Sequence, residues 1–166
     1  MDRTEIPKTI PKQDYAKWLM GWRLTHELVH AMLNIEDYRS SDCVRSSVYE
    51  GYQQFEKTAR QSKHWDALYK AVEGMPNATG ESVEKGMRFL LEEKFVREWT
   101  RRYFPEQNPT DNAALAKVYS ENLKNHLLGQ WADDLGKRVS SAKVESAANA
   151  LFDAMDGQQA DPGPKD

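Results

Sequence analysis

The sequence predicts an all-α fold, a compact bundle of five or six helices with no sheet. Apolar residues recur at intervals of three and four along stretches that lack proline, and this spacing is the helical signature. Alternation of apolar and polar residues, which marks a strand, is nearly absent. Short segments with glycine or proline separate the periodic stretches, as expected for the loops of a helical bundle.

Breakers and capping residues divide the chain into six expected helices. Ser40, Ser41 and Asp42 supply capping oxygens before the second helix, and Thr110 and Asp111 do so before the fifth. We expect helices at about residues 12–34, 41–60, 65–73, 81–104, 111–139 and 140–157.

A single domain is expected over residues 12–157. A chain of 166 residues buries roughly two-thirds of its unfolded surface in one core. We expect residues 1–11 to form an N-terminal arm interrupted by prolines, and residues 158–166 to form a tail whose composition predicts disorder.

Charge and composition indicate an ordinary soluble protein. The net charge of -3 and the charged fraction of 30% lack the basic excess of a dedicated nucleic-acid binder. Cys43 is the single cysteine, so no internal disulfide can form, and the N-terminal residues lack the apolar run of a signal peptide. We therefore expect a cytoplasmic protein with no membrane association.

The segment His26-Glu27-Leu28-Val29-His30 is the one stretch whose residue types imply chemistry. On a helix, histidines four residues apart lie on one face, where two ring nitrogens can hold zinc while the glutamate activates a bound water. His26 falls in the middle of the expected apolar stripe and His30 at its edge. Satisfied core histidines are the competing interpretation.

This segment resembles the motif of the zincin metallopeptidases. Uncharged residues stand where that family's helix has them, at Leu24, Leu28, Val29, Ala31 and Met32, whereas Arg23 departs from the pattern. The resemblance covers about 30 residues. It implies a zinc ion held by His26, His30 and, at a separation like that of the gluzincin branch, Glu50, with Glu27 as general base.

Two features of the sequence oppose this zinc hydrolase. The second expected helix has its apolar stripe at Val44, Val48, Tyr52 and Phe55, and Glu50 projects away from it. The 25 residues before His26 show no strand on which a peptide could lie. A mixed metal site of His26 with His126, or a di-iron site built on Glu27 and His30, is a further alternative, although a second Glu-x-x-His pair is lacking.

Aromatic and basic residues alternate near the end of the fourth expected helix. Arg97, Trp99, Arg101, Arg102 and Tyr103 could stack on bases and neutralise phosphates. The alternative is that the aromatic residues pack in the core and the arginines lie at its rim, near the helix C-terminus.

Two tryptophans lie outside the clearest apolar stripes. Trp65 and Trp131 are therefore candidate anchors of a protein interface. Trp18 and Trp22 are expected in the core. The sequence as a whole predicts a non-catalytic helical binding protein without a cofactor, a small subunit or adaptor of a larger protein or nucleoprotein complex. Zinc-dependent hydrolysis is the alternative.

Overall fold

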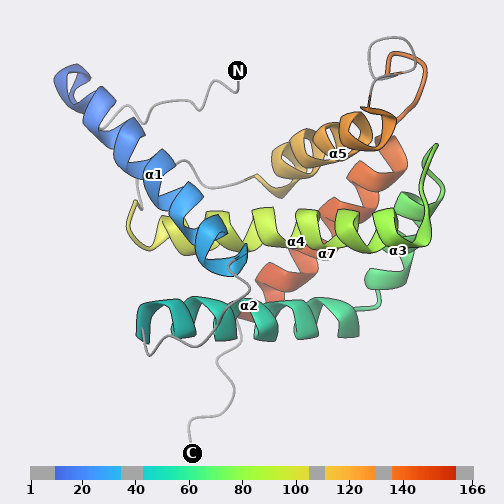
Figure 1. Cartoon of the computed structure of the whole chain (residues 1–166), viewed down its shortest axis with the longest axis horizontal. Coiled ribbons are helices and arrows are strands. Elements are labelled where there is room, and N and C mark those ends of the chain that lie inside the picture. The colour runs from blue at the N-terminus through green and yellow to red at the C-terminus, as the bar shows by residue number, and fades with distance from the viewer. Residues whose placement is uncertain (1–9, 35–42, 105–110, 130–135, 160–166) are drawn as a thin grey trace, which may run out of the picture. The chain divides into compact units, whose positions relative to one another are not determined.

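The structure is a computed structural model that describes residues 10–34, 43–104, 111–129 and 136–159. Its regular secondary structure in these ranges is entirely helical, so the all-α prediction is confirmed (Figure 1). The elements are η1 (Lys12–Asp14), α1 (Tyr15–Asn34), α2 (Cys43–Gln61), α3 (Trp65–Glu73), α4 (Gly80–Arg101), α5 (Asn112–Leu128) and α7 (Ala142–Gln159).

Three expected helix ends were wrong. α5 ends at Leu128 rather than near Val139, because Gly129 adopts a positive φ of 55° and turns the chain out of the helix. α4 ends at Arg101, and residues 102 and 103 form a turn. α7 continues to Gln159, so the first two residues of the expected disordered tail are helical. Residues 160–166 and 1–9 lie outside the described ranges.

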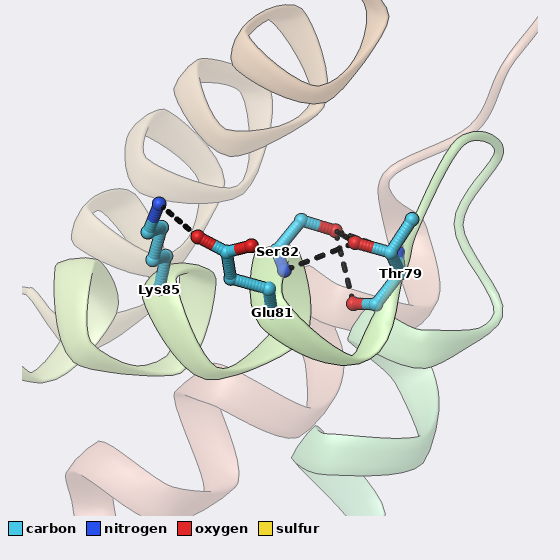
Figure 2. Close-up of polar contacts among 4 residues, drawn as sticks. All are labelled: Thr79, Glu81, Ser82 and Lys85. Carbon is cyan, nitrogen blue, oxygen red and sulfur yellow. Dashed lines mark hydrogen bonds and ion pairs between the residues drawn. The ribbon is translucent and has the colours of Figure 1, made fainter.

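The start of α4 is fixed by reciprocal hydrogen bonds between Thr79 and Ser82, as Figure 2 shows. The Thr79 backbone N–H donates to the Ser82 hydroxyl at 2.7 Å, and the Ser82 N–H donates to the Thr79 hydroxyl at 3.3 Å. This exchange satisfies donors that a helix N-terminus otherwise leaves unpaired. One turn later, the Lys85 ammonium donates to Glu81 at 2.6 Å, which lowers the pKa of the Glu81 carboxyl.

The chain divides into two compact units. The first unit comprises Met1–Gln54 with Lys94–Thr110, and the second comprises Phe55–Glu93 with Asp111–Asp166. Two of the three boundaries, after Gln54 and after Glu93, fall inside the continuous helices α2 and α4, so each of these helices contributes residues to both units. The single domain over residues 12–157 stays a prediction.

In the second unit, α7 packs against α3 and α5. Leu68, Val72, Leu151 and Phe152 are completely buried, as expected of the apolar faces of α3 and α7. α4 approaches closely at Gly86, where an added Cβ would lie 3.0 Å from Leu123 of α5. The absence of a side chain at Gly86 therefore permits this helix contact.

Buried polar groups tie α5 to α7 within the second unit. The Asn112 amide donates to the carboxylates of Asp153 and Asp156 at 2.8 and 2.7 Å. The buried Lys124 ammonium donates to the carbonyls of Gly136 and Val139 at 3.0 and 3.3 Å. These bonds hold the segment after α5 against that helix.

Glu121 completes this network. Its carboxylate pairs with Lys124 at 2.7 Å and accepts a hydrogen bond from the Ser141 hydroxyl, next to the start of α7. The bonds from Lys124 and then Ser141 lower the pKa of the Glu121 carboxyl.

In the first unit, aromatic residues of α4 pack against α2. Tyr52 lies edge-on to Phe95, with ring centroids 5.5 Å apart. Gly51 permits the approach, because a Cβ there would lie 3.4 Å from Phe95 and 3.5 Å from Trp99. α1 meets Phe104 in the same way at Gly21, where a Cβ would lie 3.2 Å from the ring.

Candidate functional site

One face of α1 carries a ladder of four aromatic rings spaced four residues apart. Trp18 and Trp22 stack with centroids 6.4 Å apart and an interplanar angle of 7°. Trp22 lies 5.7 Å from His26, and His26 lies 4.8 Å from His30 in an edge-on arrangement. The helical repeat thus places the two histidines at the end of an aromatic column, with Trp22 against one side of His26.

The two histidines turn the same ring nitrogen toward each other. The Nε2 atoms of His26 and His30 are 3.2 Å apart, and both side chains are partly buried. If one ring is neutral and donates while the other accepts, this distance is a hydrogen bond. It also matches the separation of about 3.3 Å between two nitrogens bound at tetrahedral angles to one zinc ion.

The other residues of the zinc hypothesis are exposed. Glu50 is exposed on α2, while Val48 and Tyr52 on the same helix are buried. Among the described residues, Glu50 belongs to no group of possible metal donors with the two histidines. Glu27, the expected general base, is exposed, and His126 is an exposed residue of the second unit.

The basic and aromatic residues at the end of α4 have mixed environments. Trp99 is buried, and the Arg102 guanidinium lies 4.2 Å above its ring. Arg97 is partly buried, whereas Arg101 and Arg102 are exposed and Tyr103 is 60% exposed. A cation over an aromatic face is favourable in itself, so the contact of Arg102 with Trp99 explains why these two residues lie together and requires no nucleic-acid ligand.

Trp65, one of the two predicted interface anchors, is buried in the second unit, with 8% of its surface exposed. The Arg60 guanidinium lies 4.7 Å above its ring and pairs with Glu56 and Glu84 at 3.0 and 3.5 Å. Burial would lower the pKa of Arg60, but these carboxylates raise it overall. Trp131 lies outside the described residues.

The sequence interpretation missed an apolar face on the outer side of α1. Met20, Leu24 and Leu28 follow one another at intervals of four residues and are 69%, 66% and 52% exposed. The inner face of the same helix buries Trp22, Val29 and Leu33. The spacing of Met20, Leu24 and Leu28 was the available signal, but apolar residues on both sides of α1 hid it.

No protein-family model, curated protein or solved structure matches the chain. Among the described helices, none is long and apolar enough to cross a lipid bilayer.

Proposed function

We propose that this chain is a non-catalytic helical binding protein that docks an amphipathic helix of a partner protein on the outer face of α1. The observation that carries the proposal is the exposure of Met20, Leu24 and Leu28, each more than half exposed. Full burial of a large apolar side chain is worth about 1.5–3 kcal/mol, and a partner that covers the exposed half to two-thirds of each side chain recovers about that share of this free energy.

The geometry of the face favours a helical partner. Residues at i, i+4 and i+8 form a narrow ridge along the helix axis, and such ridges pack into the grooves of a second helix. A partner helix recognises a ridge of this kind through its own apolar residues at intervals of three and four.

Charged residues on one side of the ridge give the partner a direction. Arg23 and Glu27, both exposed, lie one turn apart beside Leu24. A partner helix with an acidic residue opposite Arg23 and a basic residue opposite Glu27 would be favoured over its reverse orientation. We infer that the apolar ridge supplies affinity and these two charges supply register.

Photo-crosslinking in the host cell tests the proposal. A photoreactive phenylalanine analogue at Leu24 is expected to give one discrete adduct with another protein, and the same analogue at the exposed Lys117 of α5 is expected to give none. Adding Met20→Gln and Leu28→Gln should abolish the adduct. An adduct of twice the chain mass would instead identify a second copy as the occupant, and equal labelling at both positions would overturn the proposal.

Hydrolysis at a zinc ion is the second candidate, favoured by the separation of 3.2 Å between the Nε2 atoms of His26 and His30. It needs Glu27 as the base that activates a zinc-bound water. Zinc-dependent peptidase activity that is lost in Glu27→Gln would support this candidate against the binding protein. Nucleic-acid binding through Arg101 and Arg102 is an alternative form of the binding function. An affinity for single-stranded nucleic acid that falls steeply as the salt concentration rises would support it.

A further inference from the structure

We propose that a pocket between α4 and α5 in the second unit is a binding site for a small aromatic carboxylate. The pocket has a volume of about 330 Å³, at the lower end of the range found for small-molecule sites. Every residue that lines it belongs to the second unit. The site is therefore independent of the docking face proposed on α1.

Helical spacing fixes the two walls of the pocket. Ser82, Lys85 and Phe89 lie at intervals of three and four residues, on one face of α4. Asn122 and His126 lie four residues apart on α5 and form the second wall. Sites built on helices hold their side chains more precisely than sites on loops, so these walls suit a specific ligand.

The buried end of the pocket is apolar. Gly86 and Leu123 line it and are both buried. A Cβ at Gly86 would lie 3.0 Å from the Leu123 side chain, so the two helices are in close contact there. An apolar part of a ligand placed against these residues is removed from water, which favours binding.

Phe89 gives the pocket an aromatic wall of restricted orientation. Its ring is partly buried and packs edge-on against the buried Tyr119, with centroids 6.4 Å apart and an interplanar angle of 77°. Aromatic rings favour edge-on and offset-stacked neighbours, so this contact stabilises the ring in place. A flat aromatic ligand can pack against Phe89 in the same way, which favours it over an aliphatic one.

Lys85 gives the pocket its preference for an anion. Among the described residues that line the pocket, Lys85 carries a positive charge and none is acidic. Its ammonium has three N–H donors, and one of them bonds to Glu81 at 2.6 Å, as Figure 2 shows. Both side chains of this pair are exposed, and exposed ion pairs are weak. A ligand carboxylate can therefore share or replace the contact with Glu81.

The other polar groups of the pocket divide between the helix cap and the ligand. The Ser82 hydroxyl accepts from the Thr79 N–H at 2.7 Å and donates to the Thr79 carbonyl at 3.1 Å, so it serves the start of α4. Asn122 and His126 are exposed at the pocket, and their N–H groups can donate to a carboxylate. The ligand carboxylate is therefore placed near Lys85, with its ring against Phe89.

Binding of naphthoate to the full-length chain, followed by the amide resonances of the chain, tests the site. Naphthoate joins a flat aromatic ring system to one carboxylate, and naphthylmethanol has a similar shape without the charge. We expect naphthoate to bind one site with a dissociation constant of about 1 mM or tighter. Naphthylmethanol should bind at least about threefold more weakly, because it forms no ion pair with Lys85.

Two variants with opposite expected effects test the role of charge. Lys85→Met should weaken naphthoate binding at least about threefold and leave naphthylmethanol binding unchanged. Glu81→Gln removes the competing carboxylate and should strengthen naphthoate binding. The matched control, Lys117→Met, changes an exposed lysine of α5 outside the pocket and should leave both affinities unchanged.

The same titration of the unmodified chain locates the ligand. The amide resonances of Gly86, Phe89 and Leu123 should shift, while those of α1 stay in place. Equal affinity for the two probes, or unchanged naphthoate binding in Lys85→Met, would overturn the assignment of a carboxylate ligand. The absence of a saturable shift at the three residues, or shifts centred on α1, would overturn the pocket as the binding site.

Discussion

In the second unit, buried polar side chains of α5 bond to groups of the same unit, whereas in the first unit α1 leaves large apolar side chains in water. Asn112 and Lys124 each make two or more bonds to the segments that follow α5. Met20, Leu24 and Leu28 are all more than half exposed. The comparison therefore separates a unit whose buried polar groups bond internally from a unit that carries the exposed apolar face on which the proposed docking depends.

The largest expected effect is the loss of the ammonium of Lys124. Lys124→Met leaves the carbonyls of Gly136 and Val139 without this donor and removes the partner of Glu121. We expect the free energy of unfolding to fall by about 3 kcal/mol, measured by urea denaturation.

The matched control for this variant is Lys117→Met, which changes an exposed lysine of the same helix. Its expected change is within about 0.5 kcal/mol. Equal stabilities of the two variants would mean that the network around Lys124 does not hold the second unit together.

A smaller effect is expected from acid. The pKa of Glu121 is lowered in the folded chain, so its contribution to stability is present above the ordinary pKa of the carboxyl and is lost as the pH falls through the lowered value. Between about pH 6 and about pH 3, the unmodified chain should therefore lose more stability than Glu121→Gln does. Thermal melts across this range provide the measurement, and parallel pH profiles would contradict the prediction.

The smallest effect is expected on the outer face of α1. Replacing Met20, Leu24 and Leu28 together by glutamine should change the free energy of unfolding by less than about 0.5 kcal/mol, because these side chains are exposed and glutamine has a similar helix propensity. In contrast, Leu33→Ala on the buried face should cost about 2 kcal/mol. A large loss in the triple variant would mean that this face packs within the chain.

Most of the fold could be predicted because the residues that begin and end its helices act locally in the sequence. The glycine and proline break at 74–77 and the cap at Asp111 set helix ends within a residue or two of those observed. The end of α5 was missed although Gly129 follows its last apolar residue, a position where glycine often ends a helix.

The candidate site could be predicted only in part. The pairing of His26 with His30 follows from their spacing on one helix, and the structure has their Nε2 atoms 3.2 Å apart. The outer face of α1 was missed, because periodicity alone cannot choose between two apolar sides of one helix.

The parallel stack of Trp18 and Trp22 gives α1 an optical signature of its own. Two indoles with an interplanar angle of 7° and centroids 6.4 Å apart couple their electronic transitions, and the coupling disappears when the helix unwinds. Near-ultraviolet circular dichroism can therefore follow the folding of α1 separately from that of the second unit, where Trp65 lies alone beside Arg60 among the described tryptophans.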